Sequence, residues 1–196
     1  MPNFYKETAR GNSTVRIDDS LYSNRELFLT TGIDPCSSSE FIKQLMFLDR
    51  QDNSEITLYI NSPGGDVVSG LAVYDFINTL KSPVRTVCIG TAASMGAIIF
   101  LAGKKREMLP HTRIMLHDPF FASNRCEIKK ANEMKMELET LNEFRDELSE
   151  IIAKKTGKPA KKILEITVND TYFTAKQAIE FGLATGIIKG AKEHKK

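Results

Sequence analysis

Blocks of apolar residues alternate with longer amphipathic segments between residues 26 and 89. The apolar blocks at Glu26–Thr30, Glu55–Ile60 and Val84–Ile89 have the length and composition of strands. The segments between them, Ser37–Leu48 and about Val67–Leu80, have the length of helices, and serines at the start of the first can act as caps. This order predicts an α/β fold with a mostly parallel sheet and right-handed crossovers.

The alternation continues through a helix that opens near Ser94 and a short strand at Arg113–Leu116, with glycine or proline between the elements. In parallel sheets of this kind the functional cleft lies where loops leave the carboxyl ends of the strands. Gly65 and Ser94 both fall at such ends. The last section is expected to contain a helix at Lys161–Ile166, an extended stretch at Val168–Thr174 and a helix at Ala175–Phe181.

A long charged segment, from about Glu127 to Thr156, has apolar residues every three or four positions and predicts one amphipathic helix. At 1.5 Å per residue it would extend roughly 43 Å, more than a small domain needs for its own core. An ordinary helix packed on its own domain would show the same pattern. The length favours an arm that packs against another subunit.

The chain has 196 residues, of which 41% are hydrophobic, enough for one compact domain and too few for two. We expect that domain over residues 21–196, after a mobile segment over residues 1–20, which has few apolar anchors. The 27 basic and 25 acidic residues are largely intermixed, for a net charge of +2. No field therefore exists to hold a nucleic acid.

No segment of the sequence is suited to a membrane or to export. The first residues lack the apolar stretch of a secretory signal, and the longest apolar run, Ala97–Ala102, is too short to cross a bilayer. We therefore expect a cytoplasmic protein without a membrane partner. Cys36, Cys88 and Cys126 are widely spaced, which indicates neither a disulfide framework nor a zinc site, and Cys88 is expected to be a buried small hydrophobe.

Ser94 is the candidate nucleophile, because small residues on both sides of it leave space for a substrate backbone. A serine needs a base within hydrogen-bond reach to take its proton. His194 lies in a basic tail and His111 in an exposed turn, whereas His117 ends a strand. A lone histidine is more often structural than catalytic, but a strand-terminal histidine downstream of a glycine-flanked serine favours His117 as the base.

A third group must hold the base in the correct tautomer, and several aspartates are available. Asp118 is adjacent to His117 and would point away from its ring, Asp66 suits a helix N-terminus, and Asp146 lies on an exposed helix face. Asp170 remains by elimination.

Backbone N–H groups of Gly65 and Met95 are suitably placed in the sequence to stabilise the oxyanion of a tetrahedral intermediate. The helix that opens at Ser94 adds its dipole. A tight turn between strand and helix would explain the glycine pair equally well if Ser94 were ignored.

Four stretches, Tyr59–Gly65, Ala92–Ala97, Arg113–His117 and Asp170–Ala175, resemble in their order the signature motifs of ClpP, the proteolytic subunit of the ATP-dependent Clp protease. The resemblance covers nearly the whole chain and implies a ClpP/crotonase-like spiral of β-β-α units. It assigns Ser94 as nucleophile, His117 as general base and Asp170 as orienting acid. The same resemblance assigns the N–H groups of Gly65 and Met95 to the oxyanion hole.

Members of that family form seven-membered rings stacked in pairs, a tetradecamer, in which a handle helix from each subunit crosses the equator. The helix at about 127–156 would be this handle. The resemblance also implies that a hexameric Clp ATPase, which uses ATP, docks on apical hydrophobic pockets near Tyr59. Unfolded protein would then enter through axial pores lined by the N-termini. No metal or organic cofactor is expected on this chain.

Three positions depart from the family pattern. Asp118 stands where glutamine is usual, Phe120–Cys126 replaces a glycine-rich strand, and Val168-Asn169 replaces a charged pair. We expect from these departures a different cleft shape and weaker coupling between ring stacking and activity.

The sequence thus predicts a serine endopeptidase that hydrolyses unfolded polypeptides to short peptides inside stacked rings, in protein quality control. One alternative is a ring subunit that is inactive or weakly active until a paralogous sister subunit joins. Another is an acyl-CoA hydratase-type enzyme, against which the Ser-His-Asp set argues.

Overall fold

The computed structural model describes residues 3–8, 11–121 and 129–189 of the chain. Its elements in chain order are β1 (Asn3–Thr8), β2 (Gly11–Arg16), α1 (Ile17–Ser23), β3 (Glu26–Leu29), α2 (Pro35–Gln51), β4 (Ile56–Ser62), α3 (Val67–Thr79), β5 (Val84–Ala93), α4 (Met95–Ala102), β6 (Lys105–Met108), β7 (Arg113–Leu116), α5 (Ala131–Thr156), α6 (Ala160–Thr167), β8 (Thr171–Thr174), α7 (Ala175–Phe181) and β9 (Gly186–Ile187).

The described residues form one seven-stranded sheet and a separate two-stranded hairpin, β1–β2. Strands β3, β4, β5, β6 and β9 are parallel neighbours in that order, β7 runs parallel to β5, and β8 pairs antiparallel with β7. The α/β class and the mostly parallel sheet predicted from the sequence are therefore confirmed. Strand β5 is central because its first part pairs with β6 and its last residues, Thr91–Ala93, pair with β7.

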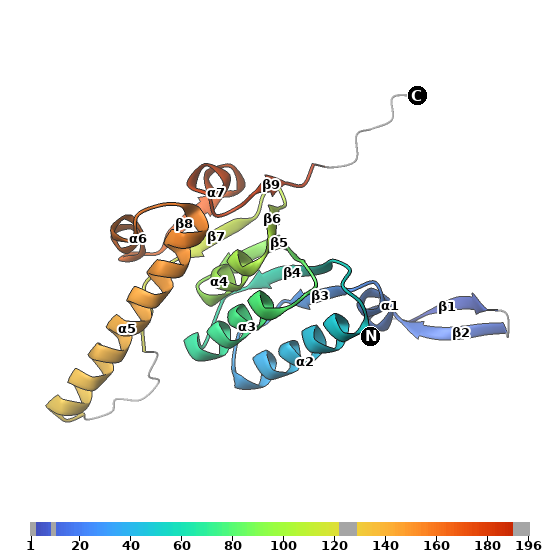
Figure 1. The fold of residues 1–196 in the computed structure, drawn as a ribbon, viewed down its shortest axis with the longest axis horizontal. Coiled ribbons are helices and arrows are strands. Elements are labelled where there is room, and N and C mark those ends of the chain that lie inside the picture. Colours follow the sequence, from blue (N-terminus) through green and yellow to red (C-terminus); the bar gives the residue numbers. More distant parts are fainter. Residues whose placement is uncertain (1–2, 9–10, 122–128, 190–196) are drawn as a thin grey trace.

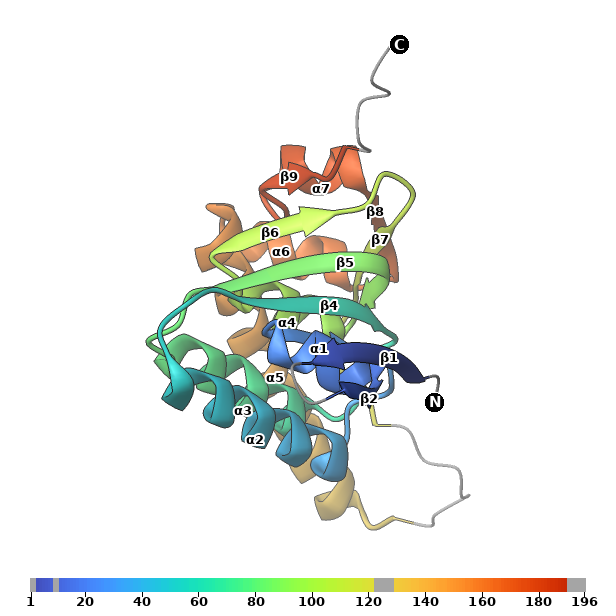
Figure 2. The ribbon, with the colours of Figure 1, turned by 90° about the vertical axis from the view of Figure 1, so that its right-hand side faces the viewer.

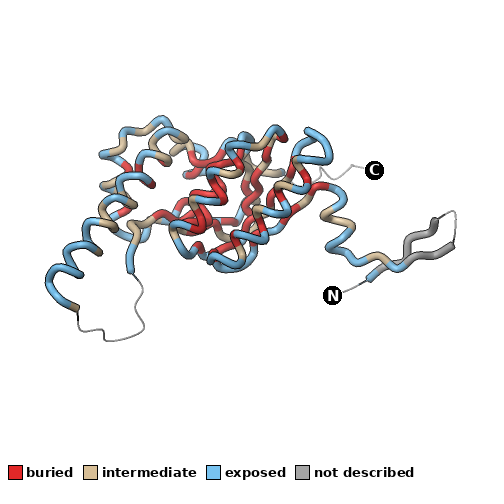
Figure 3. The backbone as a smooth tube through the Cα atoms, turned by 60° about the horizontal axis from the view of Figure 1, so that its bottom comes forward, coloured by how far each residue is buried: buried red, intermediate tan, exposed pale blue. Residues whose placement is uncertain are grey.

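Helices α2, α3 and α4 lie beside one another on one face of the sheet (Figures 1 and 2). Every residue of α4 is buried, which explains the apolar run at Ala97–Ala102 as the centre of the core. Figure 3 shows that the buried residues concentrate in this body of the molecule. None of the helices within the described ranges is long and apolar enough to span a membrane.

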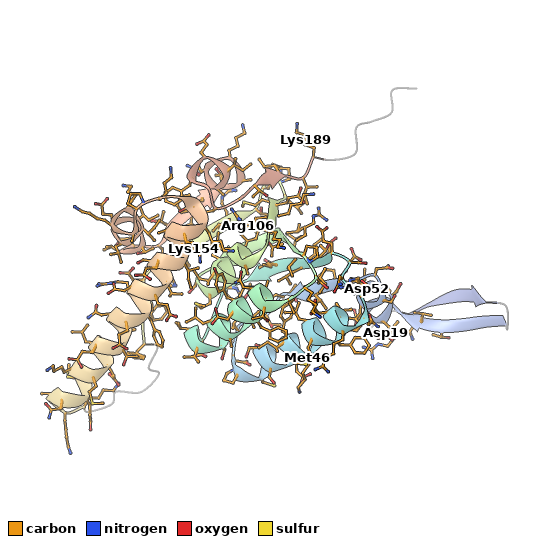
Figure 4. The ribbon with its side chains drawn as sticks, viewed as in Figure 1. Asp19, Met46, Asp52, Arg106, Lys154 and Lys189 are labelled. Atoms are coloured by element: carbon orange, nitrogen blue, oxygen red, sulfur yellow. The ribbon has the colours of Figure 1, made fainter. Side chains whose placement is uncertain are left out.

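Helix α5 packs on α4 and α6 through its C-terminal part and leaves the body through its N-terminal part (Figure 1). Leu148 and Ile152 are buried, and Lys154 marks the end that lies against the body (Figure 4). The outer part exposes several large apolar side chains, Met134, Met136 and Leu138. Its 26 residues correspond to about 39 Å of helix.

The structure differs from the sequence prediction in two respects, the residue at which α5 begins and the presence of several short elements. Helix α5 begins at Ala131 rather than near residue 127, because the Glu133 side chain accepts a hydrogen bond from the Lys130 backbone N–H at 2.9 Å and so caps the helix there. Residues 127 and 128 lie outside the described ranges. The apolar pattern also missed β1, β2, α1, β6 and β9. Of these, β6 (KREM) has three charged residues out of four, Lys105, Arg106 and Glu107, and gives no apolar signal.

Candidate active site

Two neighbouring parallel strands bring Ser94 and His117 to the same edge of the sheet. Ser94 follows β5 directly, and its backbone N–H donates a hydrogen bond to the carbonyl oxygen of Met115 in β7 at 2.9 Å. His117 follows the last residue of β7. Both line one cleft of about 550 Å³ at the carboxyl ends of the strands, where a parallel sheet is expected to hold its functional site.

The antiparallel strand β8 brings Asp170 to His117. Leu116 lies opposite Thr171 in the ladder, so the residue after one strand lies beside the residue before the other. His117 Nδ1 and Asp170 Oδ1 are 3.2 Å apart. An ionised carboxylate can only accept, so Nδ1 carries the hydrogen, and in the neutral imidazole Nε2 is then the nitrogen available as a base. The His117 side chain is 16% exposed and that of Asp170 is 59% exposed.

Ser94 occupies a sharp turn between β5 and the buried helix α4. Its backbone has φ 52° and ψ −125°. Ser94 and Arg25 alone among the non-glycine residues in the described ranges have a positive φ. This strained backbone conformation redirects the chain from strand β5 into helix α4 within one residue. Within the described ranges no hydrogen bond joins the Ser94 hydroxyl to His117, and such bonds often tighten only when substrate binds.

The glycine pair after β4 lies directly against this turn. Gly64 and Gly65 have φ values of +92° and +153°. Ile33 N–H donates to Gly64 O at 2.9 Å, and Asp66 N–H donates to Ile33 O at 2.8 Å. These bonds involve the backbone groups of the residues on either side of Gly65, so the Gly65 N–H faces away from Ile33. Gly65 also lines the cleft.

Met95 supplies a second donor at this edge. It is the first residue of α4, and a first-turn N–H has no acceptor within its helix. The N–H groups of Gly65 and Met95 have no hydrogen-bond partner among the residues that the structure describes. The arrangement can stabilise negative charge on an atom bound to Ser94.

Replacing Gly64 by alanine is expected to lower kcat for the serine-peptidase reaction predicted from the sequence about 10²–10³-fold, the cost of misplacing one oxyanion donor. A Cβ at Gly64 would lie 2.7 Å from both Ala93 O and Ser94 Cβ, and 3.0 Å from Met95 N. The loop must therefore move away from Ser94. Steady-state kinetics should show the loss in kcat with a smaller change in KM.

Gly157→Ala is the matched control, since Gly157 also has a positive φ, +71°, but nothing lies within 4 Å of its added Cβ. We expect this variant to lose thermal stability and keep its kcat. Equal kcat values for the two variants would contradict the proposed contact between the loop and Ser94.

The other histidines and aspartates considered from the sequence have different surroundings in the structure. Asp66 caps α3, with its Oδ1 accepting hydrogen bonds from the Ser69 N–H at 2.8 Å and hydroxyl at 2.6 Å, as its position predicted. His111 and Asp146 are exposed, also as predicted, and His194 lies outside the described ranges. Asp118 is different, because its Oδ1 is buried without a hydrogen-bond partner in the described part of the chain.

The cysteines contribute no nucleophile to the cleft within the described ranges. Cys88 is fully buried, as predicted, and this burial raises the pKa of its thiol. Cys36 is exposed at the start of α2, and Cys126 lies outside the described ranges. No group of three or more His, Cys, Asp or Glu side chains in the described ranges is placed to hold a metal ion.

Sequence reasoning missed the apolar wall of the cleft. Leu141 and Phe144 of α5 line it together with Phe120 and Phe121. The ring of Phe120 meets the His117 ring edge to face, with centroids 5.4 Å apart. The sequence signal was present, since Leu141 and Phe144 belong to the apolar stripe of α5, but that stripe was assigned to another subunit.

A family model described as Clp protease matches residues 9–191 of the chain. The matched range includes every residue named in the cleft.

Proposed function

The chain belongs to the Clp protease family, and we propose that it is a serine endopeptidase in which Ser94 is the nucleophile, His117 the general base and Asp170 the orienting carboxylate. The observation that carries this proposal is the His117–Asp170 hydrogen bond at the edge of the cleft that Ser94 also lines. A base held in this tautomer beside a serine on a strand-to-helix turn is the arrangement that acyl transfer needs.

In the first step, Ser94 Oγ attacks the carbonyl carbon of the scissile peptide while His117 Nε2 takes the hydroxyl proton. The N–H groups of Gly65 and Met95 stabilise the resulting oxyanion. The C–N bond then breaks, and His117 passes its proton to the leaving amine. The acyl group remains on Ser94 as an ester.

Water completes the reaction by the same route. His117 takes a proton from a water molecule, whose oxygen attacks the ester carbon, and returns that proton to Ser94 Oγ as the C–O bond breaks. The carboxylic acid leaves and the free serine is restored. Asp170 stays ionised throughout and stabilises the imidazolium that forms at each step.

We propose further that the chain works in stacked seven-membered rings fed with unfolded polypeptide by a hexameric Clp ATPase, in the cytoplasm. The exposed apolar side chains on the outer part of α5 support an interface between subunits. Phe28 on the edge strand β3 and Tyr59 on its neighbour β4 stack at 4.9 Å between centroids, and Phe28 is 44% exposed, which suits an apical docking surface for the ATPase. ATP is consumed by that partner.

Two observations favour a second candidate, a ring subunit that needs a paralogous sister for activity. Asp170 is largely exposed and the Ser94 hydroxyl is not bonded to His117 in the described chain. A neighbouring subunit that covers Asp170 would hold His117 more firmly.

The proposed function is tested by reacting the purified chain with an organophosphonate, which modifies activated serines. We expect modification at Ser94, located by peptide mass mapping, together with cleavage of a short fluorogenic peptide and a particle mass of many subunits. A crotonyl-CoA substrate measured in parallel should not be hydrated. A large particle without labelling or cleavage would support the sister-dependent subunit, and hydration without cleavage would support the hydratase.

A further inference from the structure

Asp118 and Arg145 each bury a polar atom without a hydrogen-bond partner in the described ranges, Asp118 Oδ1 and Arg145 Nε. Buried polar atoms of this kind are rare and normally have a protein or water partner. The two groups carry opposite charges and line the same small cavity, of about 30 Å³. Ser94 and His117 line that cavity as well. Asp118 and Arg145 therefore line the same cavity as the candidate nucleophile and base.

The segment that carries His117 is anchored mainly from one side. Asp118 N–H donates to Thr167 O at the end of α6 at 2.7 Å, and His117 bonds Asp170 just beyond that helix. Helix α5 faces the same segment across the cavity with Leu148, Ser149 and Ile152.

On the α5 side of the cavity, the neighbouring polar group is already satisfied. The Ser149 hydroxyl donates to Asp146 O within its own helix at 2.8 Å, which leaves Arg145 as the polar group of α5 suited to reach across the cavity. Asp146 Oδ1 lies 3.7 Å from Arg145 Nε, beyond hydrogen-bond distance, and its side chain is 64% exposed. Asp146 therefore makes an ion pair with Arg145 but no hydrogen bond to Nε, and the Arg145 side chain as a whole is 40% exposed.

We propose that Asp118 and Arg145 form a water-bridged ion pair across this cavity, which ties α5 to the segment carrying His117 and makes both residues positioning residues for the imidazole. A cavity of about 30 Å³ is large enough for a water molecule, and both walls offer it a polar partner. Such a water bridge satisfies the carboxylate oxygen and the guanidinium nitrogen together. The ion pair stands on this geometry alone, whereas its positioning role rests on the proposed function.

The bridge connects the base to the element that extends farthest from the body at this end (Figure 1). A displacement of α5 moves Arg145 and, through the bridge, the residue next to His117. The position of α5 and the alignment of the imidazole are then coupled.

The test is a double-mutant cycle of Asp118→Asn, Arg145→Gln and the double variant, with Asp146→Asn and Glu147→Gln as controls on the exposed face of the same helix. We expect each single variant of the pair to lower the thermal midpoint, and the double variant to lose clearly less than the sum, because either substitution alone already breaks the bridge. The same single variants should lower kcat about tenfold with KM changed less than twofold, and the controls should change neither.

If the effects of Asp118→Asn and Arg145→Gln on the thermal midpoint add up in the double variant, the proposed ion pair is wrong. It is also wrong if Arg145→Gln is coupled to Asp146→Asn, measured in a second double variant, and not to Asp118→Asn. Coupling in stability with an unchanged kcat would overturn the positioning role. Should the parent cleave no peptide, the proposed function fails on its own account, and the thermal cycle still decides whether the pair exists.

Discussion

Replacing Ser94 by alanine will lower kcat for peptide hydrolysis about 10⁶-fold, the size of effect found when the nucleophile of a serine protease is removed. Without Oγ no acyl-enzyme forms, and the N–H groups of Gly65 and Met95 can assist only direct attack by water. Alanine keeps a Cβ, so the strained turn at φ 52° is no more costly than before. The thermal midpoint and the particle mass should therefore match the parent, and the kinetics should show the whole loss in kcat.

Ser23→Ala is the control for this variant. Ser23 is exposed on α1, and its hydroxyl donates to Ser20 O within the same helix at 2.7 Å. We expect its kcat and its organophosphonate labelling at Ser94 to equal those of the parent. A Ser94→Ala protein that retains more than a few per cent of the parent activity would show that another group attacks the substrate.

Replacing Asp170 by asparagine is expected to lower kcat about 10⁴-fold with little change in KM. The asparagine amide can donate to His117 Nδ1, which then no longer carries the hydrogen. Nε2 becomes protonated in that tautomer and cannot accept the proton of Ser94. Pre-steady-state kinetics should show both acylation and deacylation slowed, because His117 is the base in each step, and circular dichroism should show an intact fold, because the Asp170 side chain is 59% exposed.

Asp19→Asn, an identical change at an exposed position on α1 (Figure 4), should leave kcat unaltered. The alternative carboxylate is Asp118, which is adjacent to His117 in sequence and lines the cavity beside it. A loss of less than tenfold in Asp170→Asn, combined with a large loss in Asp118→Asn, would transfer the orienting role to Asp118.

Much of the fold follows from local pattern. The strands β3, β4, β5 and β7 and the helices α2, α3 and α7 lie within a few residues of their predicted ranges, because each buries a face whose apolar spacing is visible in the chain. Ser94 was identifiable as a candidate for a similar reason, since small neighbours and a following helix are local features. Short charged strands such as β6 carry no such signal. They form because the neighbouring strand β5 supplies the hydrogen bonds.

By itself the sequence determined the parallel α/β order, the strand-to-helix turn that carries Ser94 and a strand-terminal histidine. Only the tertiary structure decided which aspartate lies beside His117, that Leu141 and Phe144 of α5 wall the cleft, and that Asp118, which buries an oxygen, lines the same cavity as Arg145. The physical reason is that these contacts join residues that are far apart in the sequence. Periodicity reports which face of an element is buried, whereas distances between residues far apart in the chain depend on the register of β7 with β8 and on the packing of α5 against the body.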